Sequence, residues 1–197
     1  MLVMKFGGTS VGTGERIAGV AELVAARLGE EPFVVVSAMG GVTDALLALS
    51  RAAREGDREA ASAALVTLGE KHHAAVEGLA LEPATASRLR REIERELARL
   101  DALATGVALL GELSARTTDA ICAAGELLSA ALTAAALERR GVPVALVDPR
   151  EWMATDATHG AATPDEAALA ANAARRLLPE RAVGKVVVTG GFVGAAP

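Results

Sequence analysis

The segment Met4-Lys5-Phe6-Gly7-Gly8-Thr9-Ser10-Val11 combines the end of a strand, a positive charge and a glycine turn. An apolar run from Leu2 to Phe6 predicts a short strand, and the two glycines that follow break it. Glycine lets the backbone approach a ligand closely, and Lys5 adds a compact positive charge beside free backbone amides. This arrangement is typical of phosphate binding. A tight strand-to-helix turn with a surface lysine has the same local residues, so the segment alone leaves both interpretations open.

Two better-known phosphate-binding motifs do not fit this segment. Gly7 and Gly12 have the spacing of a P-loop, but Thr13 occupies the position where that motif requires lysine. Gly12 and Gly14 could begin a dinucleotide-binding fingerprint, but Ile17 stands where the third glycine is required. Because the lysine here precedes the glycines, the segment predicts a phosphate site of a different design.

The composition indicates one ordinary domain or one large lobe with an aliphatic core. The chain has 197 residues, of which 51% are hydrophobic and only 2% aromatic. The core is therefore expected to consist of alanine, leucine and valine. Few aromatic side chains are available to stack on bases, and the net charge of -5 comes without a basic patch. We therefore expect no nucleic-acid partner.

Cysteine use and hydropathy indicate a cytoplasmic protein without a membrane segment. The single cysteine, Cys122, cannot form an internal disulfide, which is typical of a reducing compartment. It lies in an apolar helical stretch, where we expect a small packing residue rather than a nucleophile. The N-terminus lacks the basic and apolar regions of a signal peptide, and no apolar stretch is expected to reach the ~18 residues that span a bilayer.

The N-terminal part of the chain alternates between strand and helix. Apolar residues in the range 17–28 follow the helical period, and a glycine ends that helix. Residues 32–37 form a continuous apolar strand, as expected for a parallel sheet covered on both faces. A second glycine turn at 38–41 follows, and Thr43 or Asp44 is expected to open the next helix. Two glycine turns at the ends of two strands predict one crevice above the sheet.

The middle of the chain is helical and charged. Residues 57–79 and 83–103 each contain an apolar stripe at helical spacing, and the break at Pro83 predicts a helical hairpin. His72 lies near the first stripe and His73 lies beside it. We expect packing or surface roles for both, because no acidic or cysteine partner has the spacing of metal ligands. The sequence therefore predicts no metal site.

Alternation returns in the last third of the chain. We expect a helix over 114–140, a strand over 142–147, a loop that contains Trp152, Asp156 and His159, a helix from 163–166 that ends by Pro179, and a strand over 185–189. Together these elements predict an α/β fold. It consists of a mostly parallel sheet with helices on both faces and a long helical hairpin insertion.

Five blocks spread along the chain resemble the aspartate kinases of the amino-acid-kinase family, in the same order and with similar spacing. The first is the opening lysine–glycine segment at 5–11, and the second is the glycine loop at 35–44. The central block is Gly125-Glu126-Leu127-Leu128-Ser129, and the last two cover 147–150 and 187–194. Five ordered blocks are a specific signal, and they favour the phosphate interpretation of the first.

The resemblance implies the amino-acid-kinase fold and transfer of the γ-phosphoryl group of ATP, used with Mg²⁺, to the side chain of L-aspartate. The product, 4-phospho-L-aspartate, leads towards lysine, threonine and methionine. Residues 1–197 would be the N-terminal, phosphoryl-acceptor lobe, without the nucleotide-binding half and the ACT regulatory domains. We therefore expect negligible activity from the chain alone. Its exposed sheet surfaces favour association, such as a homo-oligomer.

The resemblance also implies which residues bind the phosphates. Lys5 is the expected catalytic residue, and it binds ATP phosphates together with Phe6, Gly7 and Gly8. No general base is expected, because a carboxylate acceptor is already ionised at neutral pH. The site then has to position two anions and neutralise their charge.

Three further residues are implied to bind the substrate. Glu126 is expected to pair with the ammonium group of the amino acid, and Ser37 lies at the end of its strand, facing the same crevice. The hydroxyl of Thr43 could contact the substrate carboxylate or could be the N-cap of its helix. The residues alone do not separate these two roles.

The sequence departs from the family at one position, and it leaves alternative functions open. Gly190 stands where these kinases usually have glutamine. Another amino-acid kinase, with glutamate, acetylglutamate or carbamate as acceptor, would have the same fold. A non-catalytic assembly module that pairs through an open sheet is the alternative from another functional class.

Overall fold

The structure is a computed structural model that describes residues 1–196. Its centre is a four-stranded sheet in the order β1-β2-β4-β3, in which each neighbouring pair is parallel. The strands are β1 (Leu2–Phe6), β2 (Pro32–Val36), β3 (Val144–Leu146) and β4 (Val186–Gly190). The predicted α/β class is confirmed. β3 is shorter than the strand predicted over 142–147, because only residues 144–146 pair with β4.

The burial of the strands follows from their places in the sheet. The central strand β4 is buried throughout and β2 nearly so, as expected for valine-rich strands with cover on both faces. β1 lies at the edge of the sheet and alternates. Met4 and Phe6 pack against the larger core, whereas Val3 and Lys5 are exposed on the opposite face. The edge strand therefore leaves Lys5 accessible.

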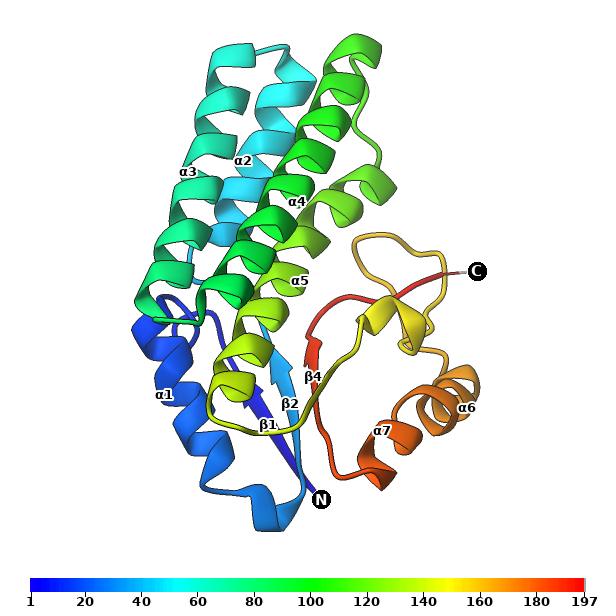
Figure 1. Cartoon of the computed structure of the whole chain (residues 1–197). Coiled ribbons are helices and arrows are strands. Elements are labelled where there is room, and N and C mark those ends of the chain that lie inside the picture. The colour runs from blue at the N-terminus through cyan, green and yellow to red at the C-terminus, as the bar shows by residue number, and fades with distance from the viewer. Residues whose placement is uncertain (197) are drawn as a thin grey trace.

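Two helices, α1 (Gly14–Ala25) and α5 (Ala115–Arg139), cover one face of the sheet (Figure 1). α1 begins at the N-cap Thr13, whose side chain accepts a hydrogen bond from the amide of Arg16. α5 is long and apolar enough to cross a membrane by length and composition, contrary to the expectation from the sequence. Most of its apolar window is buried in the fold, as in the core helix of a water-soluble domain.

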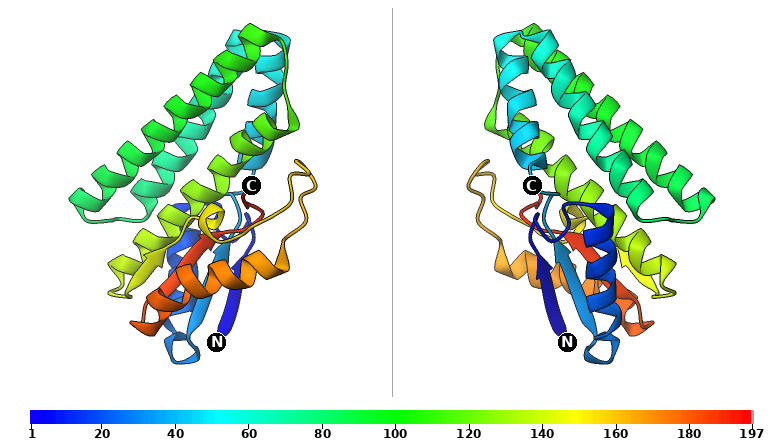
Figure 2. Two further views of the ribbon diagram at one scale, coloured as in Figure 1. Left: turned by 90° about the vertical axis from the view of Figure 1, so that its right-hand side faces the viewer. Right: turned by 90° about the vertical axis from the view of Figure 1, so that its left-hand side faces the viewer.

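Three further helices form a bundle above the carboxyl ends of the strands (Figure 1). They are α2 (Val42–Glu55), α3 (Arg58–Gly78) and α4 (Pro83–Leu110). Figure 2 shows α3 and α4 as the predicted helical hairpin, leaning away from the sheet. α4 continues beyond the predicted end at residue 103, because Ala104 and Val107 prolong its buried stripe as far as the left-handed cap Gly111.

The two adjacent histidines of α3 make local contacts, as the sequence predicts. His72 is buried, and its Nδ1 lies 2.7 Å from the carbonyl oxygen of Leu68. The Nε2 of His73 lies 2.7 Å from a carboxylate oxygen of Glu94 on α4. The first histidine therefore packs within the bundle, and the second joins the two helices of the hairpin.

The other face of the sheet is covered by α6 (Glu166–Arg176), α7 (Leu178–Ala182) and the chain after β3. Trp152 packs edge-on against Phe33 of β2, with ring centroids 6.0 Å apart. Helices on both faces are thus confirmed, although this second layer leaves β1 open. The prediction that this helix ends by Pro179 is confirmed: α6 ends at Arg176, and Pro179 lies in the first turn of the separate helix α7, where proline needs no amide partner.

Candidate active site

Three loops meet at the carboxyl ends of β1, β2 and β4 (Figure 1). The amide of Gly40, after β2, donates to the carbonyl of Gly8, after β1, at 2.9 Å. The amide of Gly191, after β4, donates to the carbonyl of Val36 at 2.7 Å. The two glycine turns therefore lie side by side at the place of the predicted crevice, the edge where ligands bind in parallel sheets.

The neighbouring glycines Gly7 and Gly8 have different surroundings. A Cβ atom on Gly8 would lie 2.7 Å from the carbonyl oxygen of Ala38, closer than such atoms approach. A Cβ on Gly7 would meet open space, and this residue is exposed. Gly8 thus allows the two loops to pack, whereas Gly7 presents bare backbone at the surface.

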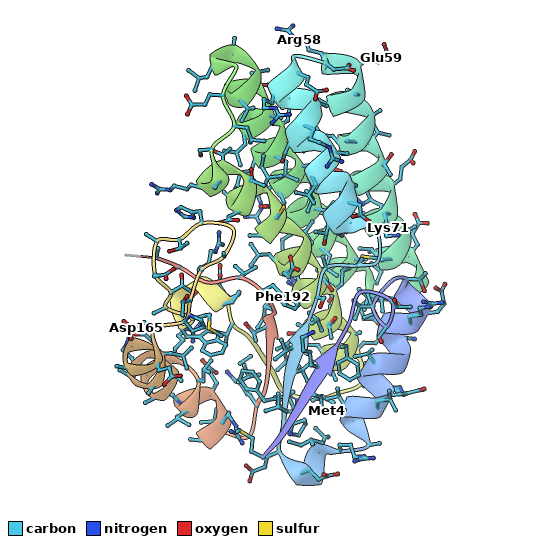
Figure 3. All side chains as sticks on the ribbon, turned by 180° about the vertical axis from the view of Figure 1, so that it is seen from behind. Met4, Arg58, Glu59, Lys71, Asp165 and Phe192 are labelled. Atoms are coloured by element: carbon cyan, nitrogen blue, oxygen red, sulfur yellow. The ribbon has the colours of Figure 1, made fainter. Side chains whose placement is uncertain are left out.

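Lys5 supplies a positive charge near the end of β1, beside the loop that follows β4. Its Nζ lies 4.8 Å from the centroid of the Phe192 ring, a cation–π contact worth about 0.5–1 kcal/mol at an exposed site. Phe192 follows β4 in a left-handed conformation, with φ of 57° and 86% of its surface exposed. Figure 3 shows its side chain beside the tips of the strands. The contact therefore orients Lys5 and leaves it reachable from solvent.

Glu126, in the middle of α5, places a buried carboxyl group beside Ala38, which follows β2, and Gly190, which ends β4. The side chain is buried, and one carboxylate oxygen accepts a hydrogen bond from the amide of Ala38 at 3.3 Å. Burial raises the pKa of Glu126, and the hydrogen bond from Ala38 opposes that rise. A buried carboxylate with one backbone donor is suited to bind a cationic group that enters the crevice.

The N-terminus of α2 faces the same region and corrects one prediction. The helix begins at Val42, and its N-cap is Gly41 in a left-handed conformation with φ of 80°. Thr43 is therefore not the N-cap, because Gly41 caps the helix two residues earlier than expected. Thr43 lies exposed in the first turn, where the partial positive charge of the helix favours an anion.

A sequence model of the amino acid kinase family matches residues 1–197 of this chain. The chain belongs to the amino acid kinase family. Lysine-sensitive aspartokinase 3 of Escherichia coli (strain K12) is 35% identical over 195 residues, which are 99% of this chain and 41% of that protein. Aspartokinase 1, chloroplastic, of Arabidopsis thaliana is 36% identical over 76% of this chain and 25% of that protein. This amino acid kinase chain thus spans less than half the length of these relatives.

Solved structures of aspartate kinases have the same fold. Escherichia coli aspartokinase III in complex with aspartate and ADP (R-state) matches all of this chain, with a TM-score of 0.89 and 35% identity. The matched part is 41% of that structure's chain. Aspartate kinase from Synechocystis matches 98% of this chain and 22% of its own, with a TM-score of 0.56 and 25% identity. The resemblance of this amino acid kinase to aspartate kinases is therefore confirmed at the level of fold and sequence.

The predicted site residues of this amino acid kinase lie at or near the carboxyl ends of β1 and β2 and on the helices α2 and α5, and they differ in exposure. Lys5, Gly7 and Thr43 are exposed, Phe6, Gly8 and Ser37 are half-buried, and Glu126 is buried. The side chain of Phe6 packs against the larger core, so it can approach a phosphate only through its backbone. The roles of these residues in binding and catalysis stay predictions. The fold shows that residues far apart in the sequence lie at the same end of the sheet.

Two contacts near the site were not predicted from the sequence. The block at 187–194 contains Phe192, but nothing in it indicates that the ring meets Lys5. The carboxylate of Asp119 lies 3.0 Å from Nδ1 of His159 and accepts a hydrogen bond from the amide of Gly160 at 3.0 Å. Asp119 precedes Glu126 by two helical turns, and this spacing on one face of a helix is a signal that could have identified it.

Metal ligation and thiol chemistry find little support around this crevice. Within residues 1–196, no three His, Cys, Asp or Glu side chains are grouped so as to hold a metal ion. Cys122 is half-buried, and burial raises the pKa of its thiol, with the carboxylates of Glu126 and Asp119 raising it further. The thiol is therefore protonated at neutral pH and packs as a small apolar group, in line with the prediction.

Proposed function

We propose that this chain is the phosphoryl-acceptor part of an aspartate kinase, which transfers the γ-phosphoryl group of ATP to L-aspartate and gives 4-phospho-L-aspartate. The observation that supports this proposal most is that a buried Glu126 and an exposed Lys5 both lie beside the loops at the carboxyl ends of the strands, Glu126 against Ala38 and Gly190 and Lys5 against Phe192. The carboxylate of Glu126 can pair with the ammonium group of an amino acid. The charge of Lys5 can reduce the repulsion between the acceptor carboxylate and the phosphates of ATP. The structural relative crystallised with aspartate and ADP matches the whole of this chain.

The chemistry needs positioning more than acid–base catalysis. The acceptor carboxylate has an ordinary pKa of ~4 and attacks as it is. Lys5 would neutralise the charge that builds up between the acceptor and the γ-phosphoryl group, and Gly7 and Gly8 would offer backbone amides. Glu126 would hold the ammonium group, because an incoming cation favours its ionised form. Ser37 and Thr43, beside the N-terminus of α2, would bind the remaining carboxylate.

Nucleotide binding would be shared with sequence beyond these residues. The relatives are more than twice as long as the matched region, and we assign the nucleotide-binding half and the ACT regulatory domains to that additional sequence. In this proposal Mg²⁺ arrives bound to ATP. The proposed compartment is the cytoplasm, with small-molecule substrates and neither nucleic acid nor membrane as a partner.

The test is a panel of acceptors with the complete gene product. Purified protein, ATP and Mg²⁺ are incubated with aspartate, glutamate, acetylglutamate or carbamate, and acyl phosphate is trapped as the hydroxamate. We expect turnover with aspartate and at least about 100-fold lower kcat/KM with the others, because a missing or misplaced buried partner costs several kcal/mol. Preference for another acceptor would overturn the assignment of aspartate as the substrate, but the protein would still be an amino acid kinase. The chain of 197 residues alone is expected to give negligible turnover.

One feature supports a second role in assembly. β1 is an edge strand whose outer face is open, with Val3 58% and Phe192 86% exposed. Such an open, partly apolar surface favours association. Gel filtration with light scattering tests this proposal, and a chain that stays monomeric at all concentrations would contradict it.

A further inference from the structure

The loop 153–165, between β3 and α6, is tied to the helix that bears Glu126. Asp119 of α5 holds it by two contacts: its Oδ2 atom lies 3.0 Å from Nδ1 of His159 and accepts the amide hydrogen bond of Gly160 at 3.0 Å. Hydrogen bonds to a carboxylate are stronger than neutral ones. Asp156 holds the loop together from within, through the amides of Thr158 and Thr163, and Asp119 attaches its tip to α5.

The loop also holds the segment that follows β4. The amide of Thr155 donates to the carbonyl of Ala195 at 3.0 Å, and the amide of Ala195 donates to the carbonyl of Met153 at 2.9 Å. Between them, Gly194 packs so closely that an added Cβ would lie 2.7 Å from the Thr155 side chain. The start of the loop and the segment 191–196 are therefore joined through their backbones.

That segment contains Phe192, whose ring lies over Lys5 and whose backbone is left-handed, a strained conformation for a bulky residue. It follows Gly190, the last residue of β4, which lies against Glu126. Asp119 is therefore connected to Phe192 by hydrogen bonds to His159 and Gly160, by the chain of the loop, by the hydrogen bonds of Thr155 and Met153 with Ala195, and by the short segment back to Phe192.

We propose that Asp119 is a positioning residue for the phosphoryl-acceptor site. By holding His159 and Gly160, it fixes the loop 153–165 on α5, and through Ala195 it fixes Phe192 over Lys5. The residue does not touch the substrate in this proposal. The proposal has two parts. The contribution of Asp119 to the reaction rests on the proposed kinase function, whereas the attachment of the loop by Asp119 does not.

The structural part can be measured without activity, because Trp152 is the only tryptophan of the chain and borders the loop. Its Nε1 lies 3.5 Å from the hydroxyl of Thr189 on β4, and the ring is buried. We expect Asp119→Ala to raise acrylamide quenching of Trp152 about twofold and to speed hydrogen exchange in 153–165 and 191–196. Asp101→Ala on α4 removes the same charge from an exposed position and is the matched control. Unchanged quenching and exchange would overturn the attachment.

The positioning part is tested by kinetics of the complete gene product. We expect Asp119→Ala to lower kcat/KM for aspartate about tenfold or more, with most of the loss in kcat, because Lys5 is displaced while Glu126 still binds the amino acid. Asp119→Asn keeps one acceptor oxygen and should recover part of that loss, and Asp101→Ala should equal the wild type.

The outcomes separate this proposal from the proposed function. A released loop with unchanged kcat would overturn positioning and leave the kinase intact. Wild-type protein that fails to phosphorylate aspartate would overturn the proposed function, and with it the catalytic part of the proposal. The fluorescence and exchange results would still decide whether Asp119 holds the loop.

Discussion

Gly190 of β4 lies directly against Glu126 of α5: a Cβ atom on Gly190 would be 2.9 Å from Cβ of Glu126. This close approach brings the helix onto the strand at the point where the buried carboxylate meets the crevice. The family resemblance leads one to expect glutamine at this position. Glycine at position 190 therefore allows α5 to pack this close to β4, and a residue with a Cβ atom would require the helix to move away.

Gly190→Ala should destabilise the protein by about 1–3 kcal/mol, the usual cost of overpacking. The atom that it meets belongs to the helix near its backbone and cannot turn away like the end of a long side chain. Urea unfolding measures the change. Gly106→Ala in α4 is the control, because its new methyl group meets open space and should stabilise the helix by about 0.5–1 kcal/mol. Equal stabilities of the two variants would contradict the prediction.

The two glycines after β1 should respond differently to the same substitution. Gly8→Ala forces a Cβ atom to 2.7 Å from the carbonyl of Ala38, so we expect a loss of about 1–3 kcal/mol in the free energy of unfolding. Gly7→Ala meets open space and should change stability by less than about 1 kcal/mol. Gly7→Ala should instead raise the KM for ATP of the complete protein, because the backbone of Gly7 is proposed to contact the phosphates. A Gly8 variant as stable as wild type would show that the loops do not depend on this contact.

Glu126→Gln should change both stability and substrate binding. Because burial raises the pKa of Glu126 above its ordinary value of 4.5, the folded protein binds a proton that the unfolded chain releases. The stability from this group is present below pH 4.5 and is lost as the pH rises through the folded pKa. Glutamine does not titrate, so the variant should lose less stability than wild type between pH 4.5 and pH 7.

Urea unfolding of the wild type and of Glu126→Gln across this pH range isolates the contribution of Glu126 to stability, because the two proteins share all other titrating groups. The same substitution should raise the KM for aspartate about 30-fold or more, because a buried charge pair loses one partner, at about 2 kcal/mol or more. Parallel pH profiles of stability would refute the assigned environment of Glu126, and an unchanged KM would refute its role with the ammonium group.

Lys5→Met should leave the fold intact and remove activity. Lys5 is exposed, and its cation–π contact with Phe192 is worth about 0.5–1 kcal/mol, so the change in stability should be small. We expect kcat of the complete protein to fall by about 10²–10³, the usual effect of removing one group that stabilises transition-state charge. Phe192→Leu, which keeps the lysine and removes the ring, should cost far less. Normal turnover in Lys5→Met would exclude a catalytic role.

Much of the fold could be predicted because it depends on local patterns. The valine-rich strands, the helical stripes and the glycine turns predicted the class, the hairpin and the crevice. The errors lie where packing decides an end: α4 continues past residue 103, and α2 begins before Thr43. At these ends several cap residues compete, and tertiary contacts select one of them.

The sequence by itself determined that this chain forms a parallel α/β sheet of the amino acid kinase family, and it identified Lys5 and Glu126 as candidate site residues. Strand order, the exposure of one face of β1 and the contact of Phe192 with Lys5 were decided only by the tertiary structure. So was the attachment of the loop 153–165 to Asp119. These features join residues far apart along the chain, and their geometry depends on how whole elements pack, which no local pattern encodes.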